Sequence, residues 1–283
     1  MNTGMVRVLL IPFLVLITFG CKQQTLRDDG GAADATGNIG SPLVGPSPAD
    51  VYIDLSGAYL RENRLTEAFM NAKKAVIVDP RSSNAHYILA LVYQRLGEMG
   101  SADASYRKAI SLDPRNPGAL NAYGLFKCGQ KEFAVADDYF RRALNNPLYG
   151  TPWIASHNAG DCARQAGDLD RAETDYRAAL QSNPRFAPSL LSMAKVSYQN
   201  GQYMSARAYL QRYAEVAPHT AESLWLGVQT ENQLGDRDQQ ASYGLNLRNN
   251  FPDSEQARFL QTIERAMSAV MSVSYTHLRA HET

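Results

Sequence analysis

A proline recurs along this 283-residue chain at intervals close to 34 residues. The successive gaps are 34, 33, 37, 34 and 34 residues, counted between Pro80, Pro114, Pro147, Pro184, Pro218 and Pro252. Because proline cannot continue a hydrogen-bonded helix, each of these positions predicts the end of a helix. A fixed period of this size predicts stacked units, none of which can bury its apolar face alone.

The segments before these prolines share a pattern of small and aromatic residues. Ala68, Ala72 and Ala75 precede Pro80, and Tyr106 and Ala109 precede Pro114 in the same phase. This pattern resembles the tetratricopeptide repeat, in which two antiparallel helices approach closely at Gly or Ala. The sixth unit keeps Leu224 and Gly227, whereas Gln240 and Gly244 stand where a small residue and an aromatic are expected. That unit is therefore predicted to be degenerate.

The predicted fold is all-α: a right-handed superhelical solenoid of six helix pairs over residues 49–252. A capping helix should follow over 253–271, because Leu260, Ile263, Met267 and Val270 have helical spacing. Asp253 is the expected N-cap of this helix, with Gln256 as its capping-box partner. Residues 272–283 follow no pattern and resemble non-native read-through from a sequencing adapter; a genuine disordered tail is the alternative.

The N-terminus has the layout of a secretory signal over residues 1–20, with Arg7 before an apolar run that ends at Gly20. Cys21 follows directly, which resembles a bacterial lipoprotein signal and predicts lipidation of Cys21. The alternative is an ordinary signal peptide with an incidental cysteine. Lys22, in place of aspartate, favours the outer membrane by the same resemblance. Residues 21–48 contain few large apolar side chains and are predicted to be a flexible linker.

Charge and motifs argue against several classes of protein. The 28 basic and 28 acidic residues give a net charge of zero, unlike a typical nucleic-acid-binding protein. There is no phosphate-binding loop and no zinc-protease or serine-hydrolase motif, so we predict no catalytic site, metal or cofactor. His157, Asp161 and Arg164 share one helix face; we interpret them as part of a polar groove rather than as a catalytic or metal cluster. His86 and His219 are interpreted as structural.

A solenoid of this kind binds extended partners along its first helices. A flexible polypeptide partner suits a surface of amides and aromatics. The positions that face away from the second helix of each pair are Ile53, Leu60, Arg61, Tyr87, Leu91, Gln94, Arg95, Asn121, Leu125, His157, Asp161, Arg164, Gln165, Leu191, Lys195, Tyr198, Trp225, Gln229 and Asn232. The lengthened junction at 145–153 is a second candidate contact site if its loop exposes Tyr149 and Trp153; a packed irregularity is the equal alternative.

Cys128 and Cys162 fall near the ends of successive first helices, which run side by side in this fold. A disulfide between them would stabilise repeats three and four by roughly 2–4 kcal/mol. Two separate buried thiols are the alternative.

The chain resembles the PilW/PilF family of type IV pilus biogenesis proteins in three stretches, 124–130, 145–153 and 158–162. The lipoprotein-like N-terminus and the number of repeats add to this resemblance. The resemblance implies a non-enzymatic outer-membrane lipoprotein, on the periplasmic face, that acts as a pilotin. Its expected partner is the secretin subunit of the pilus machinery, besides the membrane reached through the lipid anchor. We expect a monomer that binds neither nucleic acid nor a small-molecule substrate. The alternative function is an adaptor for peptidoglycan synthases or proteases; an enzyme with an added repeat domain is the third class.

Overall fold

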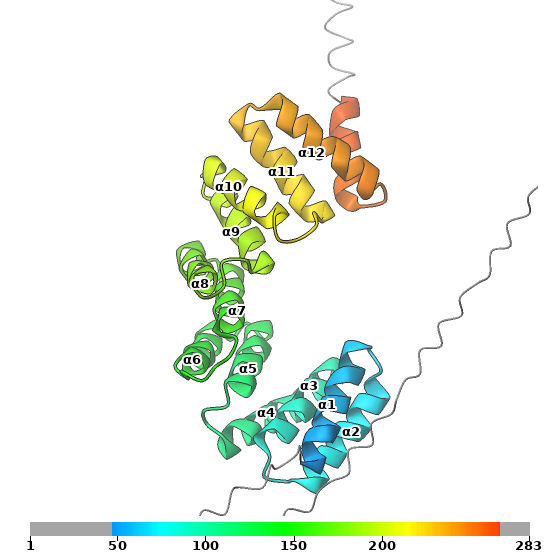
Figure 1. The fold of residues 1–283 in the computed structure, drawn as a ribbon, viewed down its shortest axis with the longest axis vertical. Helices are drawn as coiled ribbons and strands as arrows, with labels where there is room; N and C mark the ends of the chain where they lie inside the picture. Colours follow the sequence, from blue (N-terminus) through cyan, green and yellow to red (C-terminus); the bar gives the residue numbers. More distant parts are fainter. Residues whose placement is uncertain (1–46, 267–283) are drawn as a thin grey trace, which may run out of the picture. The chain divides into compact units, whose positions relative to one another are not determined.

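The computed structural model describes residues 47–266, and every regular element in that range is α-helical. The twelve bounded helices are α1 (Pro48–Arg61), α2 (Leu65–Val78), α3 (Ser83–Leu96), α4 (Met99–Leu112), α5 (Pro117–Gly129), α6 (Phe133–Leu144), α7 (Pro152–Gln165), α8 (Leu169–Ser182), α9 (Ala187–Gln199), α10 (Tyr203–Ala214), α11 (Ala221–Leu234) and α12 (Arg237–Asn250). Residues 255–266 are also helical. The predicted all-α repeat solenoid is confirmed (Figure 1).

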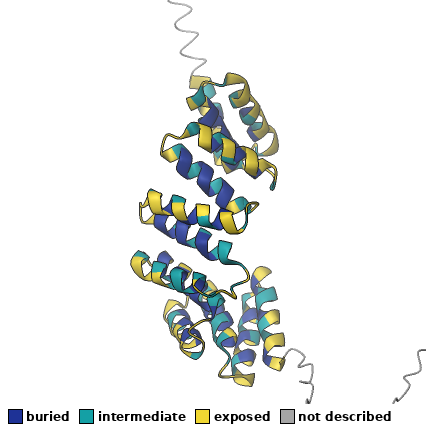
Figure 2. Cartoon of the chain, turned by 60° about the vertical axis from the view of Figure 1, so that its left-hand side comes forward, coloured by how far each residue is buried: buried dark blue, intermediate teal, exposed yellow. Residues whose placement is uncertain are grey.

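The helices alternate between two layers. Each odd-numbered helix up to α11 packs on the even-numbered helix that follows it, and each even helix up to α10 also packs on the next odd helix. Consecutive odd helices contact one another, whereas no such backbone contact joins consecutive even helices in the described range. The odd helices therefore form the tighter, inner layer. Buried residues follow the contact surfaces between helices, and exposed residues line the outer layer (Figure 2).

Local sequence sets where the helices begin and end. The side chains of Ser82 and Asn116 accept hydrogen bonds from backbone amides in the first turns of α3 and α5. Proline occupies the first turn of α1, α5, α7 and α9, where its missing N–H is not needed. Gly97 and Gly235 end α3 and α11 in the left-handed conformation, with φ of 82° and 73°.

Within three pairs, a glycine on the odd helix faces an aromatic ring on the even helix. A Cβ added at Gly124 would lie 2.7 Å from Phe140, and one at Gly160 would lie 2.7 Å from Tyr176. Neither distance is tolerated between real atoms, so glycine allows the two helices to approach. Both rings are fully buried.

The prediction that the sixth pair lacks this contact is wrong. A Cβ at Gly227 would lie 2.6 Å from the ring of Tyr243, sixteen residues further on, as Phe140 follows Gly124 and Tyr176 follows Gly160. The aromatic is therefore present one residue before Gly244, and the sequence comparison was out of register by one. Gly244 instead packs near Leu260 of the terminal helical segment.

The segment 255–266 covers the last pair through Ala257 and Leu260, which are buried with Leu224, Val228 and Leu247. Its N-cap is Ser254, whose Oγ accepts the backbone N–H of Ala257 at 3.1 Å. The predicted cap at Asp253 is therefore wrong by one residue. The predicted signal peptide, Cys21, the linker to residue 46, Met267, Val270 and the tail lie outside the described residues.

Candidate functional site

The inner layer opens into a pocket between α1 and α3, with a volume of about 420 Å³. It is lined by Gly57, Leu60, Arg61, Tyr87, Ile88, Leu91, Gln94 and Arg95. Six of these eight residues are ones that the sequence predicted for a partner groove; Gly57 and Ile88 were not predicted. Ile53 belongs to the underlying apolar cluster and does not line the pocket.

The pocket has an apolar floor and a charged rim. Leu60 and Ile88 are buried and form part of the cluster beneath α1 and α3, so Leu60 acts from the floor rather than from an open surface. Gly57 leaves space above them because it has no side chain: a Cβ there would meet nothing closer than 3.8 Å. Arg61 and Arg95 are exposed. Arg95 is held in place by a hydrogen bond of 3.0 Å from its Nη2 to Asn63 Oδ1.

Gln94 has a defined orientation in the pocket wall. The hydroxyl of Tyr106 donates to Gln94 Oε1 at 2.7 Å. Burial raises the pKa of the Tyr106 hydroxyl, so it remains a donor across the physiological range. Gln94 lines the pocket with its oxygen engaged, and its amide N–H₂ group has no protein partner within the described residues.

A second amide pair lies between α5 and α7. Asn158 Nδ2 donates to Asn121 Oδ1 at 3.0 Å, across the boundary between the third and fourth pairs. The Asn121 side-chain N–H₂ group and the Asn158 side-chain oxygen have no protein partner in the described range. Leu125, on the same helix as Asn121, is 42% exposed. The inner layer thus carries hydrogen-bonding groups of both kinds beside apolar side chains, which suits an extended peptide backbone.

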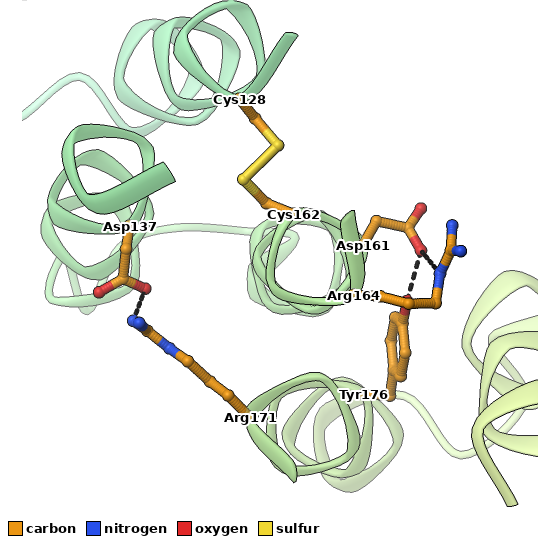
Figure 3. Close-up of a disulfide and its surroundings, with 7 residues drawn as sticks. All are labelled: Cys128, Asp137, Asp161, Cys162, Arg164, Arg171 and Tyr176. Atoms are coloured by element: carbon orange, nitrogen blue, oxygen red, sulfur yellow. Dashed lines mark hydrogen bonds and ion pairs between the residues drawn. A yellow bond between two sulfur atoms is a disulfide. The ribbon is translucent and has the colours of Figure 1, made fainter. Parts of the chain in front are cut away.

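His157 lies in a polar cluster formed by α7, α8 and α9. Its Nδ1 is 3.1 Å from Ser189 Oγ, and its Nε2 is 3.5 Å from Asp161 Oδ2. Tyr176 donates to Asp161 Oδ1 at 2.5 Å, and Arg164 approaches the same carboxylate at 4.0 Å (Figure 3).

Burial lowers the pKa of His157, and the opposing effect of Asp161 does not restore it; Lys195 and Arg164 lower the pKa further. A neutral imidazole with structural partners on both nitrogens is consistent with a fixed part of the groove wall. No group of three or more His, Cys, Asp or Glu side chains in the range 47–266 could hold a metal ion.

Three predicted groove residues of the later repeats, Lys195, Tyr198 and Trp225, have protein partners of their own. Lys195 Nζ lies 2.6 Å from Glu222, and Tyr198 contacts the ring of Tyr203. Trp225 packs edge-on against Phe259 with 5.4 Å between ring centroids. Gln229 is partly exposed on α11. The structure therefore does not bring these residues into the α1–α3 pocket.

The lengthened junction at 145–153 does not present Tyr149 freely. Tyr149 is partly buried and packs against the apolar cluster of α3 to α7, while Trp153 is also partly buried. Leu148 is the exposed residue of this loop, at 87%. Of the two alternatives for this junction, the structure therefore shows the packed one for Tyr149.

Within the described residues, the third and fourth pairs are the neighbours joined by a disulfide, and ion pairs add to this link. Cys128 of α5 and Cys162 of α7 form a disulfide with Cα atoms 5.8 Å apart (Figure 3). On the even helices, Arg141 donates to both carboxylate oxygens of Asp175, at 2.7 and 2.8 Å. Arg171 pairs with Asp137 in the reverse direction. The sequence contained a signal for these ion pairs, because in each pair the two residues are 34 positions apart, which is the repeat length.

None of the helices within 47–266 has the length and apolar character needed to cross a membrane.

Comparison with known proteins agrees with this architecture. Residues 83–116, 127–188 and 163–228 match tetratricopeptide-repeat families. The chain is 32% identical over 253 residues to the type IV pilus assembly protein PilF of Pseudomonas aeruginosa, which covers 88% of this chain and 95% of PilF.

Two solved structures have the same fold at similar identity. Pseudomonas aeruginosa PilF superimposes with a TM-score of 0.68 at 33% identity, covering 76% of this chain and 96% of that one. PilW, described as a widely conserved type IV pilus biogenesis factor, gives a TM-score of 0.69 at 30% identity, covering 75% and 98%. The chain therefore belongs to the PilF/PilW family of tetratricopeptide-repeat proteins of type IV pilus biogenesis.

Proposed function

We propose that the protein is a non-enzymatic scaffold of the pilotin kind: an outer-membrane lipoprotein that promotes localisation and oligomerisation of the pilus secretin. The observation that carries this proposal is the match to PilF over 95% of its length, because it covers the whole repeat array rather than a single repeat. The N-terminal sequence supports the lipid anchor, since Cys21 directly follows a signal-like apolar run.

The mechanism assigns separate tasks to Cys21 and to the first repeats. A lipidated Cys21 supplies the membrane address, with more than one acyl chain needed for stable anchoring. The α1–α3 pocket holds a segment of the secretin subunit: an apolar side chain enters above Leu60 and Ile88, and Gln94 donates to the backbone of that segment. Covering an extended segment in this way also prevents premature edge-to-edge association of secretin subunits.

Deletion of the gene, followed by complementation with the intact chain, tests this function. We expect loss of heat-resistant secretin multimers from the outer-membrane fraction and loss of surface pili, both restored by the intact chain. Replacement of Cys21 by Ala in the complementing copy should release the protein from the outer-membrane fraction. Normal secretin rings and pili in the deletion strain would contradict the proposal.

A further inference from the structure

The outward face of α2 carries exposed apolar side chains, and at two of these positions, Met70 and Ile77, the later even helices have small or polar residues. Met70, Ile77 and Val78 are 54%, 74% and 47% exposed. The positions equivalent to Met70 in the later even helices are Ala104, Asp138, Thr174, Ala208 and Ala241. Those equivalent to Ile77 are Ser111, Asn145, Gln181, Glu215 and Arg248. The repeat fold therefore does not require apolar residues at these two positions, and the first pair has them for another reason.

The same face is cationic. Lys73 and Lys74 lie between Met70 and Ile77, and both are exposed. Their ammonium groups lie over aromatic rings, with Lys73 Nζ 5.3 Å from the Phe69 centroid and Lys74 Nζ 5.7 Å from that of Tyr52. The one acidic residue of α2 is Glu67, which pairs with Arg64 at 2.6 Å. Aliphatic side chains interleaved with unpaired lysines are typical of a helix face that contacts an anionic phospholipid surface.

The position of this face fits a membrane contact. α1 and α2 are antiparallel neighbours, and the ring of Tyr52 in the first turn of α1 meets Lys74 near the end of α2. Ile77 and Val78 therefore lie at the end of the pair where the chain enters from residue 46. Twenty-five residues lie between Cys21 and Ser47. A flexible chain of that length has a root-mean-square span of roughly 30 Å.

We propose that the outward face of α2, formed by Met70, Lys73, Lys74, Ile77 and Val78, rests on the anionic phospholipid leaflet to which the chain is tethered. This inference depends on the lipid anchor of the proposed function. Three aliphatic side chains and two lysines give weak affinity on their own, but a short tether raises the local lipid concentration enough to hold the contact. Because α2 belongs to the outer layer, this contact directs the α1–α3 pocket away from the lipid surface.

The test places an environment-sensitive fluorophore at two equivalent positions of the full, lipidated chain. One variant is Met70→Cys and the other Ala104→Cys, each labelled with NBD. The two positions lie 34 residues apart, on α2 and α4. The proteins are reconstituted into phosphatidylethanolamine–phosphatidylglycerol vesicles and into phosphatidylcholine vesicles. We expect blue-shifted emission and quenching by lipid-borne quenchers at position 70 in the anionic vesicles, and neither at position 104.

Charge and apolar variants sharpen the test. Lys73→Gln/Lys74→Gln should lower the ratio of docked to undocked label about 30-fold, from a factor of about 5 for each lysine near an anionic surface. Ile77→Glu should abolish the shift, whereas the matched control Ser111→Glu should leave it unchanged. Circular dichroism spectra equal to those of the parent chain would show that the variants are folded.

The other outcomes overturn the proposal in different ways. Co-flotation with vesicles and identical emission at positions 70 and 104 would show that the anchor holds but the face does not dock. Failure of the processed chain to float would remove the anchor and the docking together. A shift without lipid that is lost on dilution would assign the face to a second copy of the chain. A shift that requires added secretin would assign it to that protein.

Discussion

The boundary between α5–α6 and α7–α8 is held by a disulfide and two ion pairs, whereas the boundary between α1–α2 and α3–α4 has neither kind of link within the described residues. The boundary between α1–α2 and α3–α4 instead contains the 420 Å³ pocket, with glycine at position 57 where a side chain would fit. One repeat plan thus supports two designs: a fastened middle that fixes the geometry, and an open first junction that leaves space for a partner.

Removing the disulfide should have the largest effect on the fastened junction. Cys128→Ala/Cys162→Ala should lower the free energy of unfolding by about 2–4 kcal/mol, because the bond closes a loop of 34 residues. Urea unfolding monitored by circular dichroism measures this loss, and reductant added to the parent chain should reproduce it. Equal stability of parent and variant would show that the two helices are held by packing alone.

The glycine at the helix crossing should be the next most sensitive position. Gly160→Ala places a Cβ 2.7 Å from the Tyr176 ring and 3.1 Å from the Ala172 carbonyl, so we expect a loss of about 1–3 kcal/mol. Gly100→Ala is the matched control, since no atom lies within 4 Å of its added Cβ. That variant should gain up to about 1 kcal/mol from the lower entropy of the unfolded chain. Similar effects in both variants would contradict the close approach of α7 and α8.

The Arg141–Asp175 pair allows an asymmetric test. The Asp175 side chain is 3% exposed, whereas that of Arg141 is 40% exposed. Arg141→Met leaves a buried carboxylate without its partner and should lower the free energy of unfolding by about 2 kcal/mol, after discounting for the exposed guanidinium. Asp175→Asn leaves an arginine that can turn to solvent, so about 1 kcal/mol is expected. The reverse order, in the same urea titration, would contradict the assigned burial.

The smallest predicted effect is the pH dependence at His157. Its pKa is lowered in the folded chain relative to 6.5, mainly by burial, so the unfolded chain binds the proton more readily. The folded state is therefore disfavoured as the pH falls below about 6.5. His157→Gln should reduce the drop in melting temperature between pH 7 and pH 5; His86→Gln, at a partly exposed histidine outside this cluster, is the comparison variant. An unchanged drop would show that His157 does not contribute.

The repeat phase predicted the fold and most of the pocket lining, because residues 34 positions apart occupy equivalent places. Leu91 and Gln94 were found in this way. Gly57 was missed because it contributes to the pocket by lacking a side chain. Ile88 was missed because the pattern of an amphipathic helix does not show which aliphatic residue lines a pocket. The Asp253 cap and the Gly244 position failed by one residue, since several small or polar residues are adjacent at both sites.

The repeat phase alone does not predict which charged residues of neighbouring repeats pair with each other. Charged residues recur throughout the even helices, and only the structure shows that Arg141 reaches Asp175 while the neighbouring Arg142 approaches Asp138 of its own helix. The insertion at 145–153 likewise left two alternatives open, and only the structure shows that Tyr149 packs against the core.

The central claim, that the open α1–α3 junction receives the secretin segment, is tested most directly by filling the pocket without unfolding the chain. Gly57→Leu lies in a helix, its Cβ meets only Arg61 and Ile88 at 3.8 and 3.9 Å, and its side chain extends into the pocket. Gly100→Leu, on the outer face of α4, is the matched control. The measurement is the yield of heat-resistant secretin multimers in a deletion strain complemented with each variant at equal protein level. The account predicts loss of multimers with Gly57→Leu and a normal yield with Gly100→Leu; a normal yield with both would contradict it.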